Sequence, residues 1–503
     1  MILLVNSCLL IIRIAKLFIQ FVSTWNPYVP DFVDIHQYIV CFAVIFLCWL
    51  PFAVIRYPAG IESDAYHQIM MVEGDYPFSQ SWPVVSTLFF GYVYKLGKFI
   101  FNSNDIGIFF TVIVQMTICD LCFSRSIITQ KKLEVIRGWQ FLSLVAYSFF
   151  TIYPRYLTSL VKDALYSSFV VLFVSYLAEI LLIKSEDKKR ASKELFFLLL
   201  SGVCVCVFRK NGVFILIGCL IGSIIILLRT KIDEDKNCYT KIAVNLSASI
   251  AVYFAISFCI TNVAMIPQAP ISAVLSIPFQ QTARYLINYG NEVTETEIEA
   301  INKVSNDKEL KAGYNPKLSD GTIWSYHGKD NQELMDYIFN AWMPQFFKHP
   351  IVYIEATFNN IEGFFYPLSS EQHGIYVFTN CDSKVKYFSE LDSWKDMRND
   401  LRIYILKFEK SPVFFLFCNW AIQIWIGIFQ CTYVFQFERR KRLLVLPILV
   451  SILVCIACPT FYWNGMRYEL PVIYSNILIC SILTRGLFDN ANKRTDGFNA
   501  VPE

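Results

Sequence analysis

The chain has 503 residues, of which 55% are hydrophobic and 17% are charged, and its mean hydropathy is +0.44. Soluble proteins carry about 25% charged residues, so this composition excludes an ordinary soluble protein and indicates a membrane protein. The formal net charge of +3 gives no support for a nucleic-acid partner.

Long apolar runs recur along the chain, and a helix that spans a bilayer needs about 20 mostly apolar residues. Residues 1–34 form either a first span or an amphipathic helix that lies on the membrane. A transmembrane module follows over 35–263, and further membrane helices occupy 409–486. The predicted spans are 35–55, 105–123, 138–153, 163–183, 194–208, 213–228, 242–261, 412–435, 443–456 and 471–483. The predicted fold is a polytopic α-helical membrane protein with about 10 to 11 transmembrane helices, allowing for residues 1–34.

Basic residues gather in short connections between these runs, and cytoplasmic loops are the ones enriched in Lys and Arg. The basic connections are 125–137, 184–193, 229–241 and 437–442, and the tail 487–503 is placed on the same side. The alternation then puts the other connections on the outer face: 56–83, 153–163, 209–212 and 462–470. It also leaves the apolar segment 84–101 unable to cross, so we predict a re-entrant or juxtamembrane helix there.

The segment 264–408 is the one sizeable polar region, and we predict that it forms a mostly helical extracytoplasmic domain. Thr294 and Glu297 have the spacing of a helix capping box. The predicted helices of this domain are 276–290, 294–304, 331–347 and 350–364, and the first of them carries Arg284.

The first outer loop, 56–83, is where we expect the catalytic residue. Asp64 comes a few residues after the span 35–55, where a carboxylate is costly unless it has a partner or a function. Its functional role would be to accept a proton from, or orient, an acceptor hydroxyl. The alternative is that Ser63 or Asp64 merely caps the following helix. Glu62, Tyr66 and Gln68 lie beside it as candidate substrate-binding residues.

Arg209 and Lys210, followed by Asn211, separate two short apolar runs on the predicted outer face. Paired cations at this position suit a lipid phosphate or pyrophosphate, which Arg binds with two hydrogen bonds. The alternative is that both side chains anchor helix ends at the membrane surface.

Three further candidates lie in the connection before 163–183, and two in the last outer loop. Arg155, Lys162 and Asp163 form a charged group, although Lys162 and Asp163 can also be read as a simple ion pair. Arg467 and Glu469 stand among aromatic residues, which are themselves common at membrane interfaces.

Metal and nucleotide sites have little support in the sequence. The five histidines have no ligand spacing, and no Cys-x-x-Cys pair occurs in a polar context. We therefore assign no metal ligands and no cofactor, and a divalent metal has no supporting motif. A phosphate-binding glycine loop and a G-x-S-x-G elbow are also missing, so ATP-driven transport and serine hydrolysis are unsupported.

An ordered set of short motifs resembles an uncharacterised family of bacterial multi-pass proteins, the domain-of-unknown-function family numbered 6020, which is usually described as glycosyltransferase-like. The resemblance covers about residues 35–483. Its motifs are SDAYHQI, WPVVSTLFFG, VKDALYSSF, FRKNGVF, RYLINYGNEVTETE, GYNPKLSD and YIEATFNNIEGFFYP. Two positions depart from the family pattern: Trp82-Pro83 stands in place of His-Pro, and Lys210 in place of the first Asn of Arg-Asn-Asn-Gly.

The layout also resembles the GT-C superfamily of glycosyltransferases, which place an acidic residue in the first outer loop. This resemblance implies an inverting sugar transfer from a polyprenyl-phosphate-type lipid donor to an envelope glycan or lipid acceptor at the outer face of the cell membrane. It implies that Asp64 is the base or acceptor-orienting group and that Arg209, Lys210 and Arg467 hold the phosphate. The alternatives are a wall-polymer polymerase or ligase, a transporter or flippase of lipid-linked sugars, and an inactive scaffold.

Overall fold

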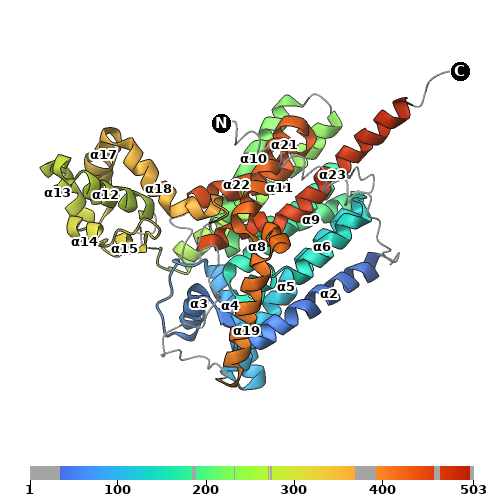
Figure 1. Ribbon diagram of the computed structural model, residues 1–503, viewed down its shortest axis with the longest axis horizontal. Helices are drawn as coiled ribbons and strands as arrows, with labels where there is room; N and C mark the ends of the chain where they lie inside the picture. Colours follow the sequence, from blue (N-terminus) through green and yellow to red (C-terminus); the bar gives the residue numbers. More distant parts are fainter. Residues whose placement is uncertain are drawn as a thin grey trace.

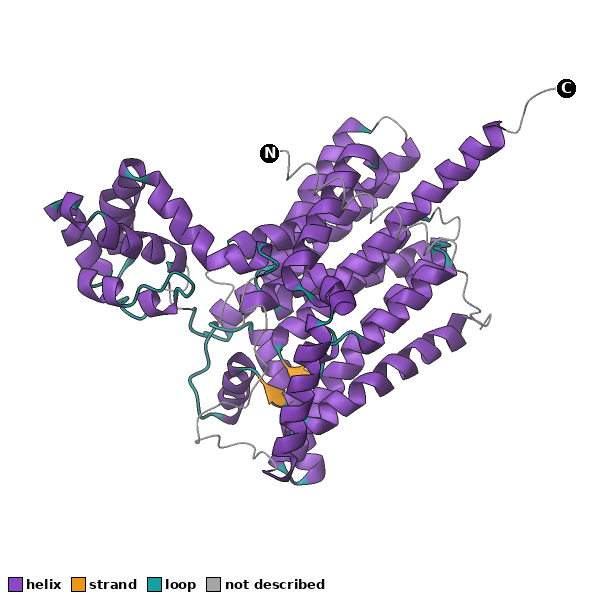
Figure 2. Cartoon of the chain, in the orientation of Figure 1, coloured by secondary structure: helices purple, strands orange, loops and turns teal. Residues whose placement is uncertain are grey.

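The computed structural model describes residues 34–183, 188–230, 233–269, 271, 275–368, 392–457 and 465–498. These residues are almost all helical (Figure 2). A bundle of long helices makes up most of the molecule, and a smaller group of short helices lies beside one end of it (Figure 1). The predicted first segment, 1–34, falls almost wholly outside the described residues.

The bundle is built from long apolar helices that pack side by side. Seven described helices are long and apolar enough to cross a membrane, or eight if a bent pair counts as one span. This finding confirms a polytopic helical membrane protein, and the exact number of crossings stays a prediction. The long helices are α2 (Asp34–Ile55), α4 (Val84–Phe101), α5 (Asn104–Lys132), α6 (Arg137–Phe149), α8 (Lys162–Leu182), α9 (Lys188–Phe208), α10 (Gly212–Arg229), α11 (Asp233–Phe258), α21 (Trp420–Phe437), α22 (Arg442–Ile456) and α23 (Leu470–Phe498).

Shorter elements connect these helices at their ends. They are α3 (Ser63–Glu73), α7 (Pro154–Leu157), η1 (Cys259–Val263), η5 (Asp392–Trp394), α19 (Lys395–Lys410), α20 (Pro412–Cys418), η6 (Arg439–Lys441) and η7 (Gly465–Glu469), with the two strands β1 (Gly60–Ile61) and β2 (Ser159–Leu160).

Aromatic side chains fill the middle of the bundle. The ring centre of Phe123 on α5 lies 5.9 Å from the ring centre of Trp49 on α2 and 4.7 Å from that of Tyr147 on α6. Tyr153 stacks on Tyr474 of α23 at 5.3 Å, and both are buried. Large rings of this kind bury much apolar area in a fixed geometry, so they hold four helices at set distances from one another.

Several predicted span boundaries differ from the helices, and two of these differences have a clear local reason. Helix α5 continues through 125–132, which was expected to be a loop, because Glu179 of α8 neutralises Arg125 at 2.6 Å and Lys132 at 3.1 Å. The single span 412–435 is instead two helices, α20 and α21, bent by 60°. Asn419 lies at the bend, where its side chain accepts a hydrogen bond from the N–H of Ile422 at 3.0 Å and starts a new helix.

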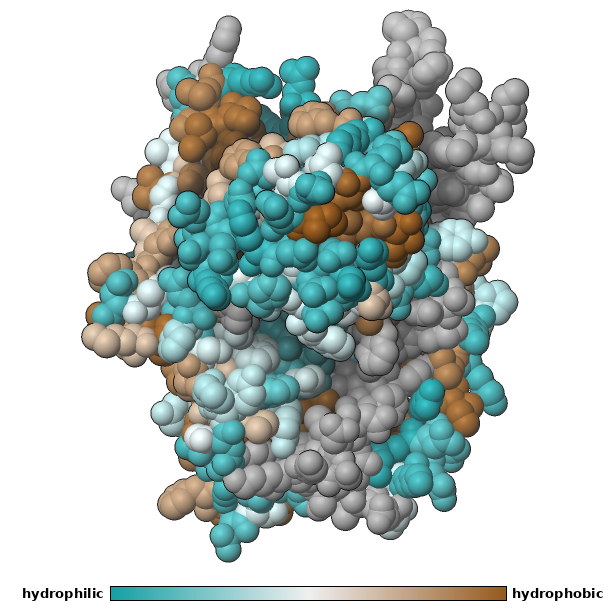
Figure 3. Space-filling view, turned by 90° about the vertical axis from the view of Figure 1, so that its left-hand side faces the viewer, coloured by the Kyte–Doolittle hydropathy of each residue, from teal (hydrophilic) through white to brown (hydrophobic). Residues whose placement is uncertain are grey.

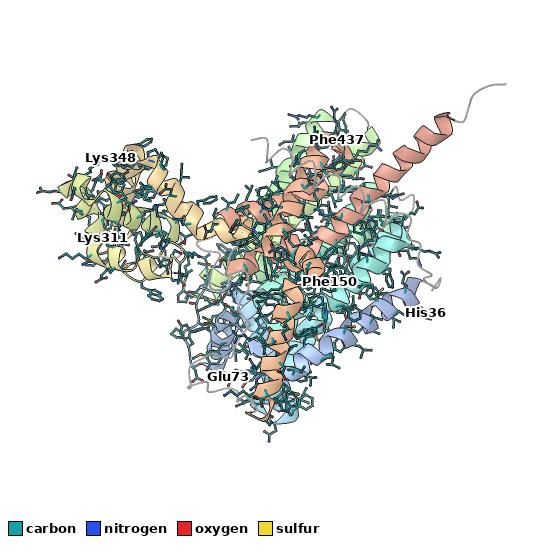
Figure 4. The ribbon with its side chains drawn as sticks, viewed as in Figure 1. His36, Glu73, Phe150, Lys311, Lys348 and Phe437 are labelled. Carbon is teal, nitrogen blue, oxygen red and sulfur yellow. The ribbon has the colours of Figure 1, made fainter. Side chains whose placement is uncertain are left out.

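Basic residues gather at one end of the bundle. Arg485 of α23 pairs with Glu134 in the α5–α6 turn at 3.1 Å, next to the basic residues that close α5. In Figure 4, His36 and Phe437 lie at this basic end, whereas Glu73 of α3 lies at the opposite end. The predicted tail 487–503 begins at the basic end, where α23 continues as far as Phe498.

Helix α4 has the predicted bounds 84–101. Its predecessor α3 packs against it so closely that a Cβ on Gly91 would lie 2.3 Å from a methyl group of Val72. The chain turns directly from α4 into α5, which runs toward the basic end (Figure 1). Both ends of α4 are thus tied to the end of the bundle that holds α3, and its re-entrant or juxtamembrane placement stays a prediction.

The helical domain, which we define as residues 275–368, has a small core of its own around Phe279, Ile301 and Tyr337. Thr294 and Glu297 form the expected capping box. The surface that the domain turns to the viewer in Figure 3 is mostly hydrophilic around one hydrophobic patch. Its elements are α12 (Ser276–Asn288), η3 (Gly290–Glu292), α13 (Glu295–Val304), α14 (Asp307–Ala312), α15 (Asp320–Ile323), α16 (Asn331–Tyr337), η4 (Ile338–Trp342), α17 (Met343–Lys348) and α18 (Pro350–Phe365). Helix α19, at the end of the predicted domain 264–408, packs instead on α2 and α20.

Candidate functional site

A short parallel pairing of β1 with β2, which we call the clasp, brings the first polar loop to the start of α8. Strands β1 and β2 pair in parallel, with Gly60 opposite Ser159 and Ile61 opposite Leu160. The N–H of Glu62 then donates to the carbonyl of Leu160 at 3.3 Å. Because each strand leads directly into a charged segment, the residues that follow β1 lie beside the residues that follow β2.

Buried side chains hold the clasp from behind. Gln115 of α5 donates to the carbonyls of Leu157 at 3.1 Å and Ser159 at 2.6 Å. Arg56, at the end of α2, donates to the carbonyl of Arg155 at 2.8 Å and to the hydroxyl of Ser159 at 3.0 Å. Buried backbone carbonyls need such partners, so these bonds let an irregular connection lie inside the bundle.

Asp64 lies at the centre of the site, in the first turn of α3. Its Oδ1 accepts a hydrogen bond from the indole N–H of Trp82 at 2.8 Å. Its Oδ2 contacts the ammonium of Lys162 and lies 2.9 Å from a guanidinium nitrogen of Arg467. The capping role considered for Ser63 or Asp64 is wrong, because Glu62 caps α3 and accepts from the N–H of Asp64 at 3.3 Å.

Two arginines complete the site. Arg467 of η7 reaches Glu62 at 2.5 Å, and its Nε lies 3.4 Å from Asp163. The other oxygen of Asp163 pairs with Arg209, at the end of α9. The reading of Lys162 and Asp163 as a simple ion pair is wrong, because each faces a different partner.

Six residues therefore form one connected group, which we call the charge cluster: Glu62, Asp64, Lys162, Asp163, Arg209 and Arg467. It contains three acids and three bases, so their formal charges cancel. The side chains are largely enclosed; Asp64 is the most exposed of them at 21%. Buried charges persist only when they are paired in this way.

The pKa values of the cluster follow from this pairing. Burial alone would raise the pKa of the Asp64 carboxyl, but Lys162 and Arg467 outweigh it and hold the pKa far below its ordinary value. Burial would lower the pKa of Arg467, but Glu62 and Asp64 raise it well above the usual range. Asp64 is thus held as a carboxylate and is a weak proton acceptor in this arrangement.

Aromatic rings support both sides of the cluster. The guanidinium of Arg209 lies 4.1 Å from the ring centre of Tyr468, in η7 next to Arg467. The ring of Trp82 stacks on His67 at 5.3 Å. A cation held over an aromatic face keeps its charge while it loses water, so Tyr468 fixes Arg209 without adding an anion.

Lys210 follows Arg209 in the chain and adds a further positive charge beside the cluster. Its ammonium donates to the carbonyl of Gln80 at 2.5 Å, and burial lowers its pKa. Gln80 is fixed in turn by hydrogen bonds with the segment after α11, at Ile266 and Pro267. Beside Lys210 and Gln80 lies a small, partly open groove with a volume of about 40 Å³. It is lined mainly by apolar residues of α4, α9, α11 and η1: Val84, Val85, Val207, Tyr253, Ile256 and Ile260.

Three predicted site residues near the cluster have other surroundings. Gln68 is buried and donates to Ser86 at 2.6 Å and Thr87 at 3.1 Å, so it joins α3 to α4. Tyr66 is half-buried on α3, and Asn211 is half-buried where α10 begins.

Three other candidates lie apart from the cluster. Arg155 is fully buried and pairs with Glu409 of α19 through two contacts of 3.1 Å, so it supports the clasp. Arg284 lies in the helical domain, where it pairs with Glu355 and donates to Tyr314 at 3.1 Å. Glu469 is fully buried, and its two oxygens have no hydrogen-bond partner among the described residues. Burial raises the pKa of Glu469 well above its ordinary value and so favours its neutral form.

The described residues contain no group of three acidic, histidine or cysteine side chains that could hold a metal ion. The three acids of the charge cluster already face three cations.

The helical domain lies near the charge cluster. Burial raises the pKa of Asp320 in α15, and the positive charge of Arg467 partly offsets this rise. Asp320 is therefore close enough to Arg467 for their charges to interact.

Comparison with known proteins gives a family. The sequence profile described as "Family of unknown function (DUF6020)" matches residues 75–495. The chain belongs to this family. The match includes four members of the charge cluster, Lys162, Asp163, Arg209 and Arg467, whereas Glu62 and Asp64 precede it. No curated protein and no solved structure matched the chain.

Proposed function

We propose that this protein is a membrane glycosyltransferase, which moves a sugar from a polyprenyl-phosphate-type lipid donor to an envelope glycan or lipid. The charge cluster is the observation that carries the proposal. It places a carboxylate, Asp64, within hydrogen-bond distance of two cations, Lys162 and Arg467. A reaction at a phosphate-linked sugar carbon needs both a group that orients the attacking hydroxyl and cations that stabilise the leaving phosphate.

The cations have a natural role toward the donor. With Lys210 the local group has four cations against three carboxylates, so an incoming phosphate can be bound without a new uncompensated charge. Arginine binds phosphate oxygens with two parallel hydrogen bonds, and Arg209 and Arg467 come from different segments. As the sugar–oxygen bond breaks, these cations would take up the charge that develops on the phosphate.

The acceptor would be oriented by Asp64. Its carboxylate is too well paired to remove a proton in the resting state, so its first role is to accept a hydrogen bond from the acceptor hydroxyl. When phosphate draws Lys162 or Arg467 toward itself, the pKa of Asp64 rises and it becomes a better base. Donor binding would thus prepare Asp64 for catalysis.

The groove beside Lys210 supports a lipid-linked donor. The groove is small, but its lining is mainly apolar, as expected of a surface that contacts the first part of an isoprenoid chain. Lys210 lies beside it, where such a chain would meet its phosphate. We place the reaction on the extracytoplasmic face of the cell membrane, because the cluster lies at the end of the bundle opposite the basic connections.

Comparison of cells that contain the wild-type protein, no protein, or the Asp64→Asn variant tests the proposal. Envelope glycans and lipid-linked sugars are measured by mass spectrometry. We expect one glycan substituent to be missing without the protein and with Asp64→Asn, and the lipid-linked donor to rise. Glu73→Gln is the matched control, because Glu73 lies on the same helix but pairs with Lys98 at 3.3 Å. Unchanged glycans and lipids in all strains would contradict the proposal.

A transporter or flippase of lipid-linked sugars is the second candidate. The 60° bend between α20 and α21 favours it, since discontinuous helices recur in transporters. The same experiment separates the two functions. If the protein is a flippase, the donor should accumulate on the inner face when the protein is missing. If it is a transferase, the donor should accumulate on the outer face, where an externally added sugar-cleaving enzyme can reach it.

A further inference from the structure

An exposed apolar stripe runs along α18. Ile351 is 67% exposed, Ile354 is 62% exposed and Phe358 is 55% exposed. Their spacing of three and four residues places them on one face of the helix. Phe347 of α17, 75% exposed, precedes them by another four residues. Exposed apolar residues that line up in this way mark an interaction surface rather than scattered surface positions.

The stripe does not contribute to the core of the helical domain. The buried face of α18 consists of Val352, Tyr353 and Ala356, and the helix packs on α12. Tyr353 lies on this buried face, and its hydroxyl donates to the carbonyl of Trp342 at 2.9 Å. Ile354 and Phe358 project from the opposite side of the same helix, so the domain folds without covering them.

The far end of α18 is anchored in the bundle. Ile361 and Phe364 belong to the core of the bundle, and α18 packs against α21. The indole N–H of Trp425 donates to the carbonyl of Phe365 at 2.8 Å, and Trp425 is half exposed on the outside of α21. Trp425 comes five residues after α21 begins, which is about 7.5 Å along the helix axis. Phe365 therefore meets α21 near the edge of the apolar layer.

The direction of α18 completes the argument. In Figure 1 it runs crosswise to α2, α6 and α23, and α12 lies on its side away from the spanning helices. The apolar stripe is thus turned toward the space beside the bundle, at the level where a lipid leaflet would surround α21. Glu355 pairs with Arg284 of the domain and forms a polar edge next to the stripe.

We infer that α18 is an interfacial helix, which rests on the surface of the bilayer with Ile351, Ile354 and Phe358 in contact with lipid. Trp425, exposed on α21, contacts the end of α18 at Phe365, so the same lipid layer would reach both helices. An amphipathic helix held in this way binds lipid through its apolar face while its polar edge faces water. The contact fixes the height of the helical domain beside the charge cluster, and it is independent of the proposed reaction.

Photochemical cross-linking tests the inference. Benzoylphenylalanine is introduced in place of Ile354 or Phe358 in the full-length protein, which is then placed in nanodiscs of phosphatidylethanolamine and phosphatidylglycerol. After irradiation, intact mass spectrometry counts phospholipid adducts. The matched controls carry the same group at Glu355, on the polar edge, and at Lys311 on the exposed side of α14 (Figure 4). Size-exclusion chromatography confirms that each variant is folded.

We expect phospholipid adducts several-fold more often at Ile354 and Phe358 than at Glu355 or Lys311. Equal yields at all four positions would overturn the inference. Protein dimers in place of lipid adducts would also overturn it, because they would assign the stripe to a second copy of the chain. If a variant does not fold, wild-type protein in nanodiscs that contain a diazirine phospholipid gives the same answer: adducts within 347–358 support the inference, and their absence there overturns it.

Discussion

Replacing Asp64 with Asn tests whether the charge cluster is a set of mutually dependent pairs. The side chain keeps its shape and an oxygen for Trp82, but it loses the charge that faces Lys162 and Arg467. Arg467 retains Glu62 at 2.5 Å, so Lys162 is the cation that loses most. Removing one partner of a buried ion pair costs about 3–5 kcal/mol, and the remaining acids favour the lower end, about 3 kcal/mol.

This cost predicts a measurable change in unfolding temperature. An unfolding entropy of about 2.1 cal/mol/K per residue gives roughly 1 kcal/mol per degree for a chain of this length, so Asp64→Asn should unfold about 3 °C lower. The assay is tryptophan fluorescence of detergent-solubilised protein during heating at a fixed rate. Glu73→Gln should shift the temperature by less than about 1 °C, because its lysine partners are about 40% exposed.

A second substitution makes the test specific. Lys162→Met in the Asp64→Asn background removes the uncompensated cation, so the double variant should regain most of the lost stability. It should remain inactive, because neither the carboxylate nor the cation returns. The assigned pairing would be refuted if Asp64→Asn is as stable as the wild type. It would also be refuted if the double variant loses more stability than the two single variants lose together.

Three further predictions concern residues around the cluster. Glu469→Gln should stabilise the protein increasingly as the pH rises above the ordinary pKa of a glutamate. Burial raises the pKa of Glu469 in the folded protein, so above the unfolded pKa the wild type loses up to about 1.4 kcal/mol of stability per pH unit relative to the variant. Parallel plots of stability against pH for the two proteins would contradict this. Arg155→Met should cost about 3 kcal/mol of stability, because it leaves Glu409 unpaired. The double variant Arg155→Met with Glu409→Met should regain that stability and still make the glycan product. Loss of the product in a stable double variant would show that Arg155 acts in the site. Trp82→Phe should cost about 2 kcal/mol, the value of a hydrogen bond to a charged acceptor. In an Asp64→Asn background, where the acceptor is a neutral amide oxygen, the loss should fall to about 1 kcal/mol, which a double-mutant cycle measures. Equal losses in both backgrounds would show that Trp82 acts by packing alone.

The helical membrane fold could be predicted from the sequence because its signal extends over many residues. Apolar runs of about 20 residues predict spanning helices directly. The bounds 84–101 of α4 and the capping box at Thr294 were predicted correctly for the same reason, since both patterns are local. The span 412–435 failed because one polar side chain, Asn419, bends an otherwise continuous apolar run.

The cluster could be predicted only as a set of candidates. Asp64, Arg209 and Arg467 were identified because charge at a membrane surface is costly, which selects residues but not their partners. The pairing depends on the clasp between β1 and β2, and two residues per strand are too few to give a sequence pattern. Adjacent Lys162 and Asp163 therefore looked like one ion pair, although their side chains face different partners.

The same limit explains the candidates that lie elsewhere and the partners that were missed. Arg284 and Arg155 have the composition of site residues, but their carboxylate partners, Glu355 and Glu409, are distant in sequence. Trp82 was noted only as a departure from the family pattern. Its indole N–H reaches Asp64 because α3 folds back toward α4, and the eighteen-residue separation gives no indication of that contact.

Binding of a polyprenyl phosphate to the purified protein is the most direct test of the central claim, that the cluster and the groove beside it receive a lipid-linked phosphate. Native mass spectrometry can count the bound lipid in the wild type, in Lys210→Gln and in the matched control Lys95→Gln, whose lysine is bound to the carbonyl of Val72 away from the groove. The account predicts one retained lipid in the wild type and in Lys95→Gln, and a strong loss in Lys210→Gln. Equal retention by all three proteins, or by none, would contradict it.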